Sequence, residues 1–218
     1  AGKRDALMTL SSRVSFAKAL MAAVARGAVK ANELPADIVR QLRAHGVKDI
    51  NATLDKVWGV SRSTPAAKLA EIAKYKKLLE AKVNRPVDLP RGRALFQRTC
   101  EQCHKLYGEG GEIGPDITGS NRNNLDYLLT NMLDPNAEVP NDYRTTILHT
   151  KDNRVLVGVI RRSEGQSVTI AMPAEEVTVA KRDVAAIDPQ DFSMMPEGLV
   201  LALKVDELRD LVAYLRGS

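Results

Sequence analysis

Hydrophobic positions recur with helical spacing in the first part of the chain and with strand-like alternation further on. Up to residue 86, apolar residues repeat at helical spacing in four stretches, and glycine or proline separates one stretch from the next. The stretches predict helices over residues 5–26, 35–45, 49–58 and 65–82. Because short loops join them, we expect a helical bundle or the end of a helical-repeat array.

Residues 142–189 follow a different pattern, in which β-branched residues alternate with polar ones between regular turn signals. This pattern predicts about five short antiparallel strands in a small barrel or sandwich, the last of them near Val184 to Ile187. After this stretch Leu208, Leu211 and Leu215 recur at helical spacing, which predicts a final helix with an apolar stripe.

The balance of charge divides the chain near residue 86. Residues 1–86 contain 17 lysines and arginines against 7 acidic residues, a net of +10, whereas residues 87–218 contain 15 against 20, a net of −5. Pro86 and Pro90 lie at the change of sign and favour a domain boundary there. We therefore expect a helical domain over 1–86 and a second domain over 87–218, with residues 142–189 inserted into it.

The basic character of residues 1–86 bears on binding partners. A solvated helical face is the commoner explanation of such charge, and a docking face for an acidic redox protein or for anionic lipid is the alternative. Nucleic acid is not expected, because aromatic residues, 4% of the chain, are not interleaved with the basic ones. The hydrophobic content of 44% suffices for a core, and no apolar run reaches transmembrane length.

The stretch with the clearest chemistry runs from Cys100 to His104 and reads C-E-Q-C-H, the C-x-x-C-H spacing of a c-type haem attachment site. Two thiols at this spacing become thioethers to one porphyrin, and the adjacent imidazole becomes the proximal iron ligand. Cys100 and Cys103 are the only cysteines in the chain. A zinc site would need four nitrogen or sulfur ligands, and besides His104 there are only His45 and His149. A redox dithiol would need a thioredoxin-like context, which the sequence lacks.

The surroundings of this motif resemble a class I c-type cytochrome. A short helix that begins at Pro90 precedes the motif, a Gly-Pro-Asp loop follows it at 114–116, and a Met-Pro loop at 193–199 comes before the last helix. A closer resemblance, over residues 87–217, is to the haem-binding domain type of planctomycetes and verrucomicrobia. In that family the domain usually closes a longer protein, behind a β-propeller and helical repeats described as dehydrogenase-like.

The cytochrome resemblance implies roles for individual residues. Gly92 and Phe96 would contact the last helix near Leu211 and Tyr214. The Pro115 carbonyl would accept the ring N–H of His104, and Met195 would be the distal iron ligand, so that His104 and Met195 together hold the metal.

Several other residues compete for roles at such a haem. Met194 is adjacent to Met195, and His149 and Met172 in the inserted strands are further candidates for the distal position. Arg122 could pair with a haem propionate, and an ordinary exposed arginine is the equal alternative. Tyr127 is another propionate candidate, although a core position suits it better.

Taken together, these features predict a mainly α protein: a cytochrome c-like helical haem domain with an inserted small antiparallel β-barrel or sandwich, preceded by a helical segment. The two ends of the insertion should lie close together. Three roles are open for the insertion, which are partner docking or dimerisation, covering the haem edge, and passive elaboration of a loop.

The resulting functional prediction is a monohaem electron carrier rather than an enzyme, with one covalent haem c and a redox protein as its partner. The alternatives are a gas-binding sensor or haem enzyme with an open distal site, and a helical interaction module at 1–86 with the haem as a structural support. A homodimer is compatible with the sequence but is not required by it. Because haem is attached outside the cytoplasm, we expect a periplasmic or otherwise extracytoplasmic protein, processed or part of a longer chain.

Overall fold

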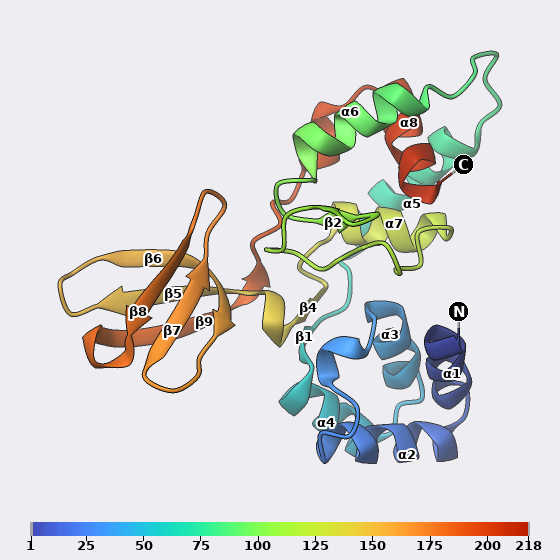
Figure 1. The fold of residues 1–218 in the computed structure, drawn as a ribbon. Helices are drawn as coiled ribbons and strands as arrows, with labels where there is room; N and C mark the ends of the chain where they lie inside the picture. The colour runs from blue at the N-terminus through green and yellow to red at the C-terminus, as the bar shows by residue number, and fades with distance from the viewer. Residues whose placement is uncertain (1, 218) are drawn as a thin grey trace. The chain divides into compact units, whose positions relative to one another are not determined.

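A computed structural model describes residues 2–217, which divide into two compact units. The first unit runs up to Ser61 and includes Glu138–Asp142, and the second comprises Arg62–Ala137 and the chain from Tyr143 onward. Figure 1 follows the chain through both units by colour. Their border lies at Ser61, 25 residues before the boundary at residue 86 that charge predicts.

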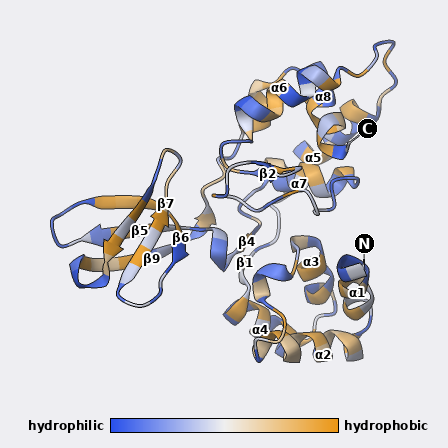
Figure 2. Cartoon of the chain, in the orientation of Figure 1, coloured by the Kyte–Doolittle hydropathy of each residue, from blue (hydrophilic) through white to orange (hydrophobic). Residues whose placement is uncertain are grey.

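The first unit is a small helical bundle, and its helices contain both apolar and polar residues (Figure 2). Its helices are α1 (Gly2–Ser11), α2 (Val14–Ala25), the 3₁₀ turn η1 (Ala31–Glu33), α3 (Ala36–Ala44) and α4 (Lys48–Val57). The helix expected over 5–26 is therefore two helices, interrupted at Ser12 and Arg13. Trp58 lies in the core, and its indole N–H donates to the Leu34 carbonyl at 2.9 Å.

A two-stranded ribbon completes the first unit. Strand β1 (Gly59–Ser61) pairs antiparallel with β4 (Glu138–Pro140). Gly59 has φ +144°, and a Cβ there would lie 2.2 Å from the Val139 carbonyl oxygen, so this position requires glycine. The Glu138 carboxylate accepts a hydrogen bond from Arg40 Nη1 at 2.5 Å.

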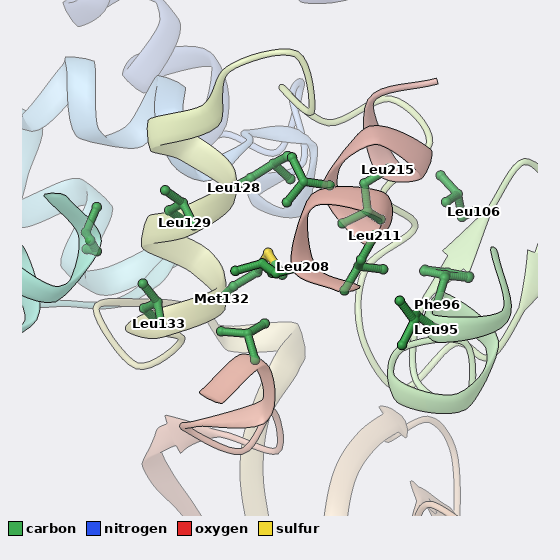
Figure 3. Packing of buried hydrophobic residues seen from close by; sticks show 13 residues of the cluster. Leu95, Phe96, Leu106, Leu128, Leu129, Met132, Leu133, Leu208, Leu211 and Leu215 are labelled. Carbon is green, nitrogen blue, oxygen red and sulfur yellow. The ribbon is translucent and has the colours of Figure 1, made fainter. Parts of the chain in front are cut away.

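The second unit contains four α-helices and a sheet. The helices are α5 (Ala66–Glu80), α6 (Leu89–Thr99), α7 (Leu125–Leu133) and α8 (Val205–Arg216), with the 3₁₀ turn η4 (Leu199–Ala202). Figure 3 shows side chains of α6, α7 and α8 pointing toward one another. We call the following buried set the helical cluster: Ile72, Leu95, Phe96, Leu106, Leu128, Leu129, Met132, Leu133, Val200, Leu208, Leu211, Val212 and Leu215.

Helices α6 and α8 cross at Gly92. A Cβ at Gly92 would lie 2.2 Å from the Asp210 carbonyl oxygen, so only glycine permits this approach. One turn further along α6, the Phe96 ring lies 5.7 Å from the ring of Tyr214. The contact between these two helices that the cytochrome resemblance implies is therefore present in the structure.

Helix α5 belongs to the second unit although it lies before the predicted boundary. Ile72 joins the helical cluster, and the guanidinium of Arg209 on α8 donates to the carbonyls of Leu78, Leu79 and Ala81 at the end of α5. These are carbonyls that a helix leaves without internal partners at its C-terminus. Arg209 therefore both satisfies them and places a cation at the negative end of the helix dipole.

The sheet has five antiparallel strands in the order β8-β7-β6-β5-β9. Its strands are β5 (Arg144–Thr150), β6 (Val155–Arg162), β7 (Ser167–Ala171), β8 (Glu176–Ala180) and β9 (Val184–Ser193). By strand pairing the sheet is open within the described residues, with β8 and β9 at its edges. Arg144 pairs with Ser193, so the ends of the predicted insertion do lie together.

The prediction of a mainly α fold is wrong. About 47% of the chain is helical and 21% is strand, with eight α-helices and a five-stranded antiparallel sheet among the residues described. The sheet is larger than expected because β9 runs six residues past Ile187, to Ser193. It also has a buried cluster of its own, formed by Leu148, Val168, Ile170 and Val179, so the second unit has both an α and a β core.

Within residues 2–217 no single helix has both the length and the apolar character needed to cross a membrane. Helices α1 and α2 meet both criteria only when they are taken together, and a bend of 120° separates them.

Candidate cofactor site

The C-x-x-C-H stretch forms a tight turn at the end of α6. The Cys100 amide donates to the Phe96 carbonyl at 2.7 Å, which continues the helical pattern by one residue. The amides of Cys103 and His104 then both donate to the Cys100 carbonyl, at 3.0 and 2.9 Å. The two cysteines are half-buried free thiols, and this turn keeps them and the imidazole together.

Both thiols lie in surroundings that keep them protonated. Burial, with a smaller effect of Cys103, raises the pKa of Cys100 to about 12, and burial also raises the pKa of Cys103. A redox-active C-x-x-C pair has the opposite property, a thiol whose pKa is lowered toward neutrality. The environment therefore disfavours the redox-dithiol interpretation of the motif.

The imidazole of His104 is fixed by a hydrogen bond to Pro115. Its Nδ1 lies 2.9 Å from the Pro115 carbonyl oxygen, and since a carbonyl can only accept, Nδ1 must carry the proton. That tautomer leaves the lone pair of Nε2 available to a metal. Burial also lowers the pKa of His104, which favours the neutral, ligating form. The contact is the one that the resemblance implies, and its role toward iron stays a prediction.

Gly114 supports the same ring from another side. A Cβ at Gly114 would lie 2.5 Å from His104 Cε1 and 2.8 Å from Nδ1. The absence of a side chain thus lets the loop backbone lie against the imidazole. Together, Gly114 and Pro115 form a cradle that sets the orientation of the ring.

Two further glycines fold the intervening loop onto the motif. Strands β2 (Lys105–Leu106) and β3 (Glu109–Gly110) form a short hairpin. A Cβ at Gly110, which has φ +113°, would lie 2.2 Å from the His104 carbonyl oxygen, and one at Gly111 would lie 2.0 Å from that of Gln102. The backbone of this glycine-rich loop therefore packs directly on the backbone of the motif.

The two methionines after β9 differ in their surroundings. Met194 packs against Ile113, Val159 and Ala171, as Cys103 does, and we call these five residues the Cys103 cluster. Met195 is half-buried outside that cluster, and its amide donates to Ser193 Oγ at 3.0 Å. The assignment of Met195 as distal ligand stays a prediction, with Met194 as the alternative.

The candidates for the distal ligand from the inserted strands, and the propionate candidate Tyr127, lie outside the Cys103 cluster. His149 is exposed on β5, and Met172 is half-buried in the turn between β7 and β8. Tyr127 is half-buried on α7.

Arg122 is held by protein groups. Its Nη1 donates to the Tyr107 hydroxyl at 2.9 Å and to the Leu215 carbonyl, and its Nη2 donates to the Thr118 carbonyl at 2.8 Å. The guanidinium also lies over the Tyr107 ring, 5.0 Å from its centroid. Arg122 thereby ties the loop after the motif to the end of α8. Its assignment to a haem propionate stays a prediction that these contacts do not favour.

Sequence reasoning missed the sheet residues of the Cys103 cluster. Val159 and Ala171 lie more than 50 residues after the motif, and each reads as an ordinary strand residue. Gln102, between the cysteines, donates from Nε2 to the Pro173 carbonyl at 3.0 Å. No local signal could have revealed these contacts, because they depend on how the sheet meets the motif.

The donor set fits a covalently attached haem, since it offers two half-buried thiols, an imidazole with Nε2 available, and Met194 in the same apolar cluster as Cys103. Among residues 2–217, no group of three or more His, Cys, Asp or Glu side chains is placed to hold a metal ion by itself. Neither the protein-family models nor the curated proteins with which the sequence was compared give a match.

Proposed function

We propose that this protein is a monohaem c-type electron carrier, with Cys100 and Cys103 as the attachment residues and His104 as the proximal ligand. The observation that carries the proposal is the hydrogen bond from His104 Nδ1 to the Pro115 carbonyl, at 2.9 Å, within a C-x-x-C-H motif. This bond selects the tautomer that a proximal ligand needs, and it makes the imidazole a stronger donor.

Bound haem would supply a one-electron couple at its iron. The residues of this chain would do the rest: Cys100 and Cys103 fix the position of the ring, while Gly114 and Pro115 orient the imidazole. Met195 would be the second protein ligand of the iron. A thioether ligand favours the reduced iron, and two protein ligands leave no position for substrate.

On this proposal the chain carries electrons and catalyses no reaction of its own. The resemblance to the planctomycete and verrucomicrobial domain type supports a place as the electron-accepting part of a larger periplasmic oxidation system. The oxidised substrate would then be handled by another protein or domain, and an acceptor protein would take the electron onward.

The test begins with the haem-loaded full chain. Covalent attachment is measured by the mass of the denatured protein and by the pyridine haemochrome spectrum, and it should disappear when Cys100 and Cys103 are both changed to Ser. A chain that never retains haem after denaturation would exclude the proposal.

A CO titration of the reduced protein tests the axial ligands. The wild type should not bind CO, whereas Met195→Ala should bind it and should have a lower reduction potential, within the ~0.8 V range that axial ligands span. Met194→Ala is the matched control for the ligand assignment and, like the wild type, should not bind CO. If Met194→Ala opens the iron instead, Met194 is the distal ligand. If the wild type binds CO readily, gas binding or haem catalysis replaces electron transfer.

A further inference from the structure

The two thiols of the motif lie in different apolar surroundings. Cys100 packs against the helical cluster. Cys103 packs instead in the Cys103 cluster, where Val159 comes from β6 and Ala171 from β7. The sheet therefore supplies a large part of the surroundings of one attachment residue and contributes nothing to the cluster that holds the other.

Two more contacts join the sheet to the motif. The Gln102 side chain donates to the Pro173 carbonyl at 3.0 Å, in the turn between β7 and β8. Met194 follows directly on β9 and also lies in the Cys103 cluster. The contact with the motif thus involves residues in or directly after β6, β7 and β9. It therefore does not depend on a single side chain.

The burial pattern on β6 shows which end of the strand makes this contact. Val155, Val157 and Val159 alternate with period two and lie on one face of the strand. Their exposed fractions are 56%, 42% and 1%, so burial increases toward the motif. Val159 pairs with Ala171, while the neighbouring pair, Ile160 and Ile170, points to the opposite face and into the sheet's own cluster.

We infer that the sheet β5–β9 is the wall of the cofactor site on the Cys103 side, where Val159 and Ala171 exclude water from the second thioether. This inference rests on the proposed function and makes it more specific. Val159 and Ala171 act here as positioning residues rather than ligands. Because oxidised haem carries one more positive charge than reduced haem, a dry environment disfavours it, so the sheet raises the reduction potential.

The first test uses the chain without haem and measures alkylation of single thiols by iodoacetamide. In a Cys100→Ser background, Val159→Ala should increase the alkylation rate of Cys103 by about an order of magnitude, because the opened contact exposes the thiol more often. In a Cys103→Ser background, the same substitution should leave Cys100 unchanged, because Cys100 packs on the helical cluster.

Val179→Ala is the matched control. Val179 is 4% exposed, lies on β8, and belongs to the sheet's own cluster, so the substitution makes the same chemical change away from Cys103. It should leave Cys103 alkylation near the rate of the parent. Gln102→Ala is a milder second variant, which removes only the bond to Pro173 and should increase the Cys103 rate several-fold. An unchanged Cys103 rate in Val159→Ala, or an equal increase in Val179→Ala, would overturn the inference.

The second test uses the haem-loaded protein and compares reduction potentials. Val159→Ala should have a lower potential than Val179→Ala at equal haem content. If haem attaches in both and their potentials agree, the inference fails while the proposed function stands. If haem never attaches, the proposed function fails, and the alkylation rates alone decide whether the sheet shields Cys103.

Discussion

At the scale of single residues, His104 owes its orientation to two neighbours that act by different means. Pro115 supplies a carbonyl acceptor for Nδ1, and Gly114 supplies room, since a Cβ there would lie 2.5 Å from the ring. The Pro115 carbonyl can fix the rotation of the imidazole only if the ring has room to approach that carbonyl. The glycine is therefore as much a requirement of the arrangement as the carbonyl.

This leads to a prediction for Gly114→Ala. The added methyl group must displace the imidazole, which strains or breaks the bond to Pro115 and costs about 1–3 kcal/mol. On the proposed function, we expect a lower yield of covalently attached haem, measured by the pyridine haemochrome, and a weaker bond from His104 to iron, seen as a change in the spectrum of the loaded protein. Gly119→Ala is the control, since a Cβ there meets nothing within 4 Å. Equal yields and spectra for the two variants would show that Gly114 has no role in orienting the ring.

The residue scale is also where sequence reasoning reaches furthest. Motif spacing alone predicts Cys100, Cys103 and His104 as haem attachment residues and iron ligand, because that chemistry needs them close together in the chain; this role stays a prediction. The resemblance adds Pro115, and the structure contains the implied contact. Arg122 shows the limit of this reasoning, since its partners Tyr107 and Leu215 come from segments whose spatial closeness no local pattern encodes.

At the scale of elements, the crossing of α6 and α8 depends on a buried carboxylate. Asp210 is 0% exposed, and its oxygens accept hydrogen bonds from the Asp88 amide at 3.1 Å, Arg85 at 2.7 Å and Arg91 at 2.5 Å. Burial alone would raise the pKa of Asp210, but these three donors outweigh it and hold the pKa below its ordinary value. The carboxylate thus joins the segment before α6 to the middle of α8.

We therefore predict that Asp210→Asn destabilises the second unit by about 2–3 kcal/mol at pH 7, because it removes a charge from a buried ion-pair network. The measurement is denaturant unfolding followed by circular dichroism. The contribution of Asp210 should be complete above its ordinary pKa of 3.8 and should disappear as the pH falls through the lowered value, so wild type and variant converge in acid. Asp206→Asn, at an exposed position on the same helix, should cost no more than about 0.5 kcal/mol. A similar loss in both variants would contradict a specific role for Asp210.

Periodic patterns predict most of the elements, although the single helix expected over 5–26 is two helices, and they do not predict contacts between distant segments. The five strands of the sheet follow from alternation and turn signals between residues 142 and 189. The unit to which α5 belongs does not follow from the sequence pattern. Charge composition predicts a domain boundary after α5, whereas Ile72 and the hydrogen bonds from Arg209 attach the helix to the second unit. Charge composition reflects the exposed face of a helix, because charged residues lie there. It does not indicate which hydrophobic core the apolar face packs into.

At the scale of the whole molecule, the fold is a mixture of α and β because the sheet is more than an inserted loop. It has its own buried cluster on one face, and on the other face Val159 and Ala171 meet the C-x-x-C-H motif. A sequence pattern can predict that a sheet exists. It cannot predict that one face packs on a distant motif, since that contact involves only a few residues of each strand.

The division into two units also makes a prediction about pH, because a buried carboxyl in the first unit behaves oppositely to Asp210. Glu138 has a side chain that is only 5% exposed, and burial raises its pKa from 4.5 to about 7, against the smaller opposing effect of Arg40. The folded first unit therefore binds this proton more tightly than the unfolded chain does. Protonation of Glu138 therefore makes its full contribution to the free energy of unfolding below about pH 4.5. This contribution is lost as the pH rises through about 7.

Trp58 makes this measurable, since it is the only tryptophan of the chain and is buried in the first unit. Denaturant unfolding followed by its fluorescence should give a free energy that falls by roughly 2.5 kcal/mol between pH 5 and pH 8, the linkage expected for a shift of this size. Glu138→Gln should remove most of this dependence, because an amide has no proton to lose, and Arg40 remains partly exposed to water. If instead the wild type becomes more stable over the same range, the ion pair with Arg40 outweighs burial, and Glu138 stabilises the unit as a carboxylate.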